Sequence, residues 1–155
     1  MVDANHEKRR AAAFERLARV MEGVGFPHAI SRVFTALTLA PGEGLSTSEL
    51  VEQLGMSRAS VSNATQFLVG TELAERYRVP GSREMHYRIL KGSWGPILGK
   101  KFAVMSSITA TVRNAMEYAE SEAALERLRE MEDVYSFFEE EFAEMMDRWN
   151  ERNKR

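Results

Sequence analysis

The sequence has 155 residues, of which 44% are hydrophobic and 28% charged, and its formal net charge is −2 at pH 7. A chain of this length can bury one sizeable core but is short for two independent domains, so we expect one compact unit. No apolar run is long enough to span a membrane, and the N-terminus lacks the apolar stretch of a secretory signal, so we expect a cytoplasmic protein. The absence of cysteine excludes disulfides, thiol redox sensing and sulfur-ligated zinc.

Two helices are predicted near the N-terminus. Apolar residues recur at spacings of three and four in the first, which we expect over residues 3–22. Gly23 and Gly25 end it, and Pro27 suits the first turn of a second helix that continues to Ala40. The apolar stripe of the first helix consists of Phe14, Leu17, Met21 and Val24.

The segment 46–70 predicts a helix-turn-helix. Ser46 and Glu49 have the spacing of a capping box, which begins a helix that ends just before Gly55. Gly55 permits a tight turn, and Ser57 is a candidate N-cap for the next helix. Two short helices joined by a short turn containing glycine are typical of a DNA-binding helix-turn-helix.

The second helix of this motif has the two faces of a recognition helix. At about 100° per residue, one face is apolar and the opposite face is small and polar, without an acidic residue. Asn and Gln can bond adenine edges, Arg can bond guanine, and the free amides of the first turn favour a phosphate. Taken alone, such a face is equally consistent with a merely solvated surface. The expected buried residues are Val61, Ala64, Thr65 and Leu68. The candidate DNA-binding residues are Ser57, Arg58, Ala59, Ser62, Asn63 and Gln66.

A β-hairpin is predicted directly behind the helix-turn-helix, where it would form a wing. Two strands, over residues 73–79 and 85–89, alternate apolar and polar side chains and flank the turn 80–83. We expect Arg76, Arg78 and Arg88 on the polar side of the hairpin. At its tip, Arg83 can reach the negative potential of a narrow minor groove. The candidate DNA-binding residues of the wing are Arg76, Arg78, Ser82, Arg83, His86 and Arg88.

Charge is distributed unevenly along the chain. Residues 57–91 carry a net charge of +3, whereas residues 120–147 carry −9. A basic middle and an acidic end indicate a molecule that presents one face to phosphates and keeps the other in solvent.

The C-terminal region predicts two long helices. The first extends over residues 96–119, and the second carries an apolar pattern of alternating spacings of three and four, the a and d seam of a heptad repeat. A helix with an apolar stripe on one face and an acidic opposite face needs a partner surface for the stripe. The first helix of the chain offers a matching apolar stripe. The expected dimer seam therefore consists of Phe14, Leu17, Met21, Leu128, Met131, Tyr135, Phe138, Phe142, Met145 and Trp149.

Three regions are expected along the chain. Residues 1–25 form an N-terminal dimerisation helix, residues 26–92 a winged helix-turn-helix DNA-binding domain, and residues 93–155 a helical dimerisation region. The predicted fold class is mainly α with a small β-wing.

Several runs resemble the GbsR-like branch of the MarR superfamily of winged helix-turn-helix regulators. They are Gly25-Phe26-Pro27, Leu54-Gly55-Met56-Ser57-Arg58, Val79-Pro80-Gly81-Ser82-Arg83 and His86-Tyr87-Arg88. The resemblance covers about residues 23–88, and Val51 stands where the motif more commonly has Ala. It implies a homodimer that reads a palindromic operator, usually as a repressor released by a small-molecule effector, without a resident cofactor.

Other interpretations of the sequence remain open at this stage. The winged domain could instead be a protein-interaction module, with the acidic C-terminal helix as its main surface. The methionines, with Trp94 and Phe102, either line a ligand cavity or fill the core. His6, His28 and His86 are too scattered to suggest a metal site, and no constellation of residues suggests an enzyme.

Overall fold

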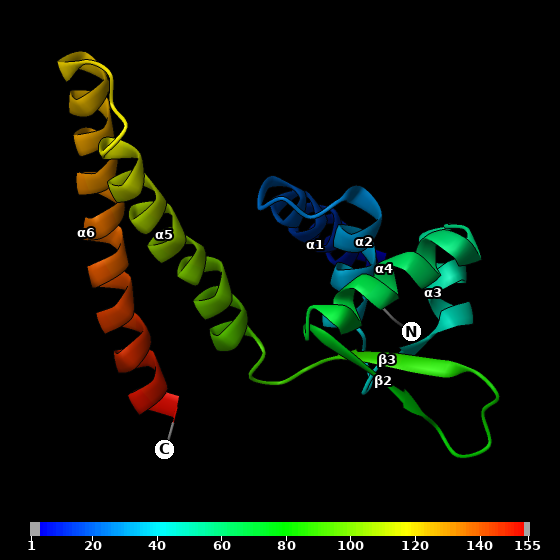
Figure 1. The fold of residues 1–155 in the computed structure, drawn as a ribbon. Helices are drawn as coiled ribbons and strands as arrows, with labels where there is room; N and C mark the ends of the chain where they lie inside the picture. The colour runs from blue at the N-terminus through cyan, green and yellow to red at the C-terminus, as the bar shows by residue number, and fades with distance from the viewer. Residues whose placement is uncertain (1–3, 154–155) are drawn as a thin grey trace. The chain divides into compact units, whose positions relative to one another are not determined.

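The chain folds into helices and one small antiparallel sheet. The computed structural model describes residues 4–153 (Figure 1). The predicted fold class, mainly α with a small β-wing, is confirmed. The expectation of one compact unit is wrong, because the chain divides into two compact units, with the boundary between Lys91 and Gly92. The long helices that follow Gly92 pack on each other and form their own unit.

The first unit holds the predicted winged helix-turn-helix and the N-terminal helix. Its helices agree with the predicted ones to within about two residues, and the predicted start at Asp3 lies outside the described residues. The short strand β1 was not predicted, because its pairing partner lies some forty residues further along the chain. The elements are α1 (Ala4–Gly23), α2 (His28–Thr38), β1 (Leu45–Ser46), α3 (Thr47–Leu54), α4 (Arg58–Gly70), β2 (Ala74–Arg78) and β3 (Met85–Ile89).

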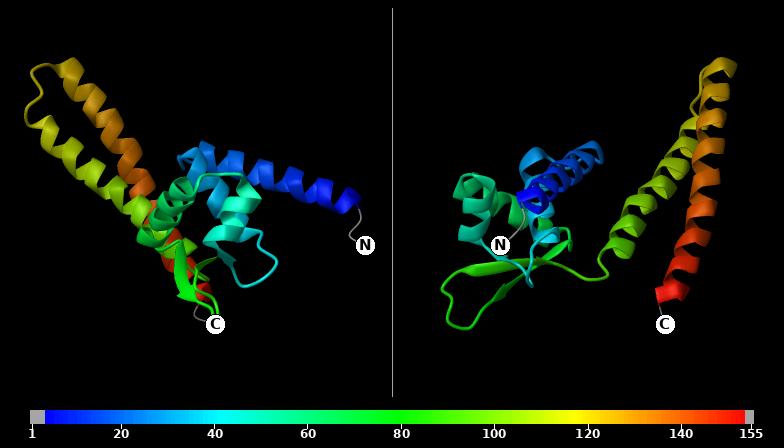
Figure 2. Two further views of the ribbon diagram at one scale, coloured as in Figure 1. Left: turned by 90° about the vertical axis from the view of Figure 1, so that its right-hand side faces the viewer. Right: turned by 180° about the vertical axis from the view of Figure 1, so that it is seen from behind.

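Helix α2 is the centre of this unit. It packs against α1, α3, α4 and β3, as the two further views in Figure 2 help to follow. Phe34 and the other large side chains of the core are at most 1% exposed, and each such burial contributes roughly 1.5–3 kcal/mol. These residues are Val33, Phe34, Leu50, Val61, Leu68 and Leu73.

Local sequence signals determine where the helices of the helix-turn-helix begin and end. The predicted capping box is confirmed: the Glu49 amide donates to Ser46 Oγ at 3.2 Å, and the Ser46 amide donates to Glu49 Oε2 at 2.7 Å. Hydrogen bonds from the backbone and then the side chain of Ser46 lower the pKa of Glu49 below its ordinary value. Gly55 then takes a φ of 62°, which permits the turn into α4 at little steric cost.

The sheet has the strand order β1-β3-β2, and all its pairs are antiparallel. In its register Ser46 stands opposite His86, and Tyr77 stands opposite His86 on the other side of β3. Gly44, just before β1, lies so close to β3 that a Cβ there would overlap the Tyr87 carbonyl and come within 2.8 Å of the Tyr77 hydroxyl. Glycine is therefore needed at this position for the close approach of two backbones.

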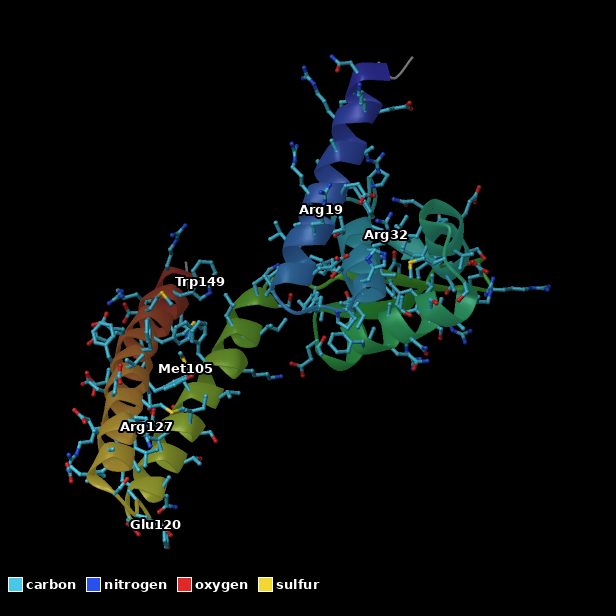
Figure 3. The ribbon with its side chains drawn as sticks, turned by 90° about the horizontal axis from the view of Figure 1, so that it is seen from above. Arg19, Arg32, Met105, Glu120, Arg127 and Trp149 are labelled. Carbon is cyan, nitrogen blue, oxygen red and sulfur yellow. The ribbon has the colours of Figure 1, made fainter. Side chains whose placement is uncertain are left out.

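The second unit is a helical hairpin. Helices α5 (Trp94–Met116) and α6 (Glu122–Asn153) run side by side, with Met105 labelled on α5 and Arg127 and Trp149 on α6 in Figure 3. Phe102 stacks on Phe142 with ring centroids 3.3 Å apart. Among the described residues, neither these helices nor the others combine the length and apolar character that a membrane span needs.

Replacing Gly44 tests how β1 is joined to β3. Gly44→Ala should lower the free energy of unfolding by roughly 1–3 kcal/mol, because the methyl group must displace backbone. Gly42→Ala is the matched control, since a Cβ there meets nothing within 4 Å. Chemical denaturation followed by circular dichroism measures both variants. Equal stability of the two would contradict the close packing at Gly44.

Candidate nucleic-acid interface

Helix α4 presents the polar face that the sequence predicts. Val61, Ala64, Thr65 and Leu68 are its buried residues, as expected. Of the six outward candidates Ser62 is half-buried, and the other five are exposed: Ser57, Arg58, Ala59, Asn63 and Gln66. The amphipathic pattern therefore positions this face correctly.

Three of these side chains form hydrogen bonds at the start of the helix or within it. The Ser60 amide donates to Ser57 Oγ at 3.1 Å, so the predicted N-cap is confirmed. Gln66 Nε2 donates to Ser62 Oγ at 3.3 Å. Within the described part of the chain, Asn63 makes no side-chain hydrogen bond. The Asn63 amide is therefore available to a base edge in both its donor and its acceptor group.

The register of the wing divides the predicted arginine row. Arg76 stands opposite Tyr87, whereas Arg88 stands opposite Glu75, so Arg88 lies on the other face of the hairpin from Arg76 and Arg78. The expectation that all three line one polar side is wrong, because directly paired residues share a face and neighbours along a strand alternate.

Arg88 is held by interactions within the protein. Its Nε donates to Glu75 Oε1 at 2.6 Å and its Nη1 to Glu43 Oε2 at 3.2 Å. Its guanidinium lies 4.8 Å from the ring centre of Tyr77. The hydrogen bond to Glu75 and then the charge of Glu75 raise the pKa of Arg88. The Glu75 and Glu43 carboxylates offset the positive charge that Arg88 keeps.

The other wing arginines face solvent. Arg76, Arg78 and Arg83 are exposed, and none of them forms an ion pair within residues 4–153. Ser82 Oγ accepts the Glu84 amide at 3.2 Å and lies 3.3 Å from His86 Nε2. Ser82 and His86 therefore belong to the internal hydrogen bonds of the wing, while three cations project from it.

Glu84 is a further residue of this surface, which the sequence did not single out. Its carboxylate accepts hydrogen bonds from the amide and the hydroxyl of Ser48 and lies 3.5 Å from Arg58 Nη2. These partners are 36 and 26 residues away along the chain, so no local pattern could have indicated them.

The predicted dimer seam of α6 divides into half-buried and exposed residues. Leu128, Tyr135 and Phe142 are half-buried, and Phe142 stacks on α5. The four remaining members are 41–50% exposed: Met131, Phe138, Met145 and Trp149. On α1, Met21 is buried and Phe14 and Leu17 are half-buried in the unit that contains α2.

One open cavity of about 350 Å³ lies among α1, α2 and α3. Arg32, labelled on α2 in Figure 3, donates to both Glu15 carboxylate oxygens at 3.1 and 3.2 Å and lies over the Phe14 ring. No methionine lines this cavity. Within the described residues, no three His, Asp or Glu side chains gather as metal ligands. The cavity lining is Glu7, Arg10, Ala11, Phe14, Glu15, Arg32, Leu39, Gln53 and Leu54.

The helix-turn-helix, the antiparallel hairpin behind it and the added strand β1 define a winged-helix protein. Residues 92–152, less than half of the chain but almost all of the second unit, match the family of MmpR5-like MarR family transcriptional regulators. No curated protein matches the sequence.

One solved structure shares this fold over most of the chain. A crystal structure of a transcriptional regulator has a TM-score of 0.71 at 19% identity, over 92% of this chain and 99% of that one. Apo MarR from E. coli has a TM-score of 0.43 at 15% identity, over 64% and 74% of the two chains. A transcriptional regulator from Thermotoga maritima has 0.43 at 14%, over 88% and 93%. The first structure shows the fold of the chain, and the family match concerns the second unit alone.

The Ser57 cap can be tested separately from any ligand. Ser57→Ala should lower the free energy of unfolding by about 1 kcal/mol, because the Ser60 amide loses its acceptor. Ser57→Asn should restore most of this stability, since Asn also caps helices well. Denaturant titration gives both values. If the two variants are equally destabilised, the hydroxyl is not acting as a cap.

Proposed function

We propose that the protein is a sequence-specific regulator of transcription that binds double-stranded DNA as a homodimer and acts as a repressor. The observation that supports this most is the presence, in one compact unit, of a non-acidic outward face on α4 and of three exposed wing arginines that form no ion pair within residues 4–153. A merely solvated face would not require such cations in the same unit. Within this proposal, residues 26–92 bind DNA, and residues 1–25 and 93–155 form the dimer.

Each part of this surface has its own role in binding. Helix α4 enters the major groove, where Asn63 and Gln66 bond adenine edges and Arg58 bonds guanine or a phosphate. Arg83 at the wing tip enters the adjacent minor groove, and Arg76 and Arg78 lie along the phosphates. Although the formal charge of the whole chain is −2, residues 57–91 carry a net positive charge, which attracts phosphates locally.

Dimerisation would place two recognition helices on one palindrome. A two-fold dimer of winged helices reads two inverted half-sites about one helical turn apart. The exposed apolar row of α6, 41–50% exposed in the single chain, offers the surface for a second copy. We assign the winged domain to the GbsR-like branch on the runs of residues 23–88, whereas residues 92–152 match the MmpR5-like family.

Release of the repressor by a small-molecule effector is proposed from the same resemblance. The site of action would be cytoplasmic, where bacterial DNA is found. A regulator of this kind needs no resident cofactor and no catalytic residue, and we accordingly propose that the protein is not an enzyme.

Substitutions in α4 and the wing should have different effects on DNA binding. Arg83→Ala should weaken binding to all duplexes and reduce the slope of log affinity against log salt by about one, because one phosphate-region contact is lost. Asn63→Ala should instead change the preferred base. Fluorescence anisotropy at several salt concentrations measures both. Arg16→Ala, which removes an exposed cation from α1, is the charge-matched control. If Arg83→Ala binds like this control, the wing does not contact DNA.

The two faces of the α6 seam should respond differently to a charge. Phe138→Glu should leave the hairpin folded but weaken dimerisation by about two orders of magnitude, because a buried unpaired charge costs roughly 3 kcal/mol or more. Phe142→Glu should unfold the hairpin itself, since Phe142 stacks on Phe102. Sedimentation velocity and helical content distinguish these outcomes, with Phe138→Leu as the control. A Phe138→Glu protein that stays dimeric would refute the outer row as the dimer interface.

A protein-interaction module is the second candidate function. The exposed Phe137 and Phe138 on an acidic helix are the observation that favours it. It requires that the protein has no measurable affinity for duplex DNA even at low salt and that a hetero-complex forms instead.

A further inference from the structure

The wing is joined to the helix-turn-helix by a hydrogen-bonded cluster that holds Glu84 at its centre. Glu84 lies between Arg83 at the wing tip and the first residue of β3. Ser48 Oγ donates to Glu84 Oε1 at 2.5 Å, and the Ser48 amide donates to Glu84 Oε2 at 3.3 Å. Both oxygens of one carboxylate are therefore fixed to a single residue in the first turn of α3.

The same cluster reaches the recognition helix. Arg58 Nη2 donates to Ser48 Oγ at 3.1 Å and lies 3.5 Å from Glu84 Oε1. Arg58 is the first residue of α4, where a cation faces the positive end of the helix dipole, and the Glu84 carboxylate offsets this. The arginine donates to the serine hydroxyl, which donates to the carboxylate, so each hydrogen bond polarises the next.

The surroundings of Glu84 keep it ionised and oriented. The Ser48 hydroxyl is the main cause that lowers the pKa of Glu84 below its ordinary value. On the wing side the Glu84 amide is anchored to Ser82 Oγ. If Arg58 leaves the carboxylate for a phosphate, both Ser48 bonds and the Ser82 bond remain. The wing can therefore keep its position while the arginine binds.

We infer that Glu84 is a positioning residue for DNA recognition, which sets the distance and angle between the wing tip and the helix-turn-helix through Ser48, with Arg58 as a further contact in the free protein. The inference rests on the proposed function. Electrostatics alone predicts the opposite effect. A carboxylate beside a DNA-binding surface repels phosphates, so removing its charge should tighten binding. The sign of the effect therefore separates positioning from charge.

Anisotropy with the full-length protein tests this on two duplexes, one selected from a random pool by the wild type and one of scrambled sequence. Glu84→Ala should weaken binding to the selected duplex about fivefold or more and leave binding to the scrambled duplex equal or tighter. Glu52→Ala is the control, because Glu52 is an exposed carboxylate on α3 without these bonds. Ser48→Ala removes the bridging hydroxyl at constant charge and should weaken selected binding in the same direction.

The cost of Arg83→Ala in a Glu84→Ala background separates positioning from folding. In the wild-type background, Arg83→Ala should remove the whole contribution of the wing contact to DNA affinity. In the Glu84→Ala background, the fold-change in affinity caused by Arg83→Ala should be at least twofold smaller, because the wing no longer holds Arg83 in place. The inference is overturned if Glu84→Ala tightens selected binding as Glu52→Ala does, or if the Arg83→Ala penalty is unchanged. If the wild type enriches no duplex and binds none at low salt, the proposed function itself fails.

Discussion

The antiparallel pairing of β1 with β3 is the constraint on which the surface formed by α4 and the wing depends. It places Ser46, the N-cap of α3, opposite His86 of the wing, and so makes the start of the helix-turn-helix and the base of the hairpin one piece. Gly44 permits this approach, because no side chain fits between it and β3. The Glu84 cluster lies two residues from this pairing and extends it to α4.

The charges of the molecule are organised by their partners as much as by their number. In the wing, Arg88 is neutralised by Glu75 and Glu43, whereas Arg76 and Arg78 face solvent without ion pairs in the described part of the chain. One hairpin thus uses the same residue type for two purposes. The ion-paired arginine stabilises the sheet, and the two exposed arginines supply the positive potential that the proposed function requires.

The sequence predicts those features that depend on local periodicity and capping. The Ser46 box, the Ser57 cap and the buried face around Val61 are set within one or two helical turns, and each is found in the structure. Features that depend on distant pairing were missed. The face of Arg88 follows from the hairpin register, and the role of Glu84 follows from a partner 36 residues away.

The two-unit organisation was missed for a related reason. An apolar pattern at heptad spacing predicts that a helix needs a partner, but it does not say which one. In the structure α5 covers the half of the α6 seam that includes Phe142, and Phe138 on the other half stays exposed. Whether a second copy covers that row depends on association between chains, which periodicity cannot specify.

Selection of bound duplexes from a random pool by the purified protein is the most direct test of sequence-specific binding. If α4 is the recognition helix of each half of a dimer, the pool becomes enriched in an inverted repeat whose half-sites are centred about 10–10.5 base pairs apart. A pool that stays as random as the starting pool after several rounds would show that the protein does not read sequence.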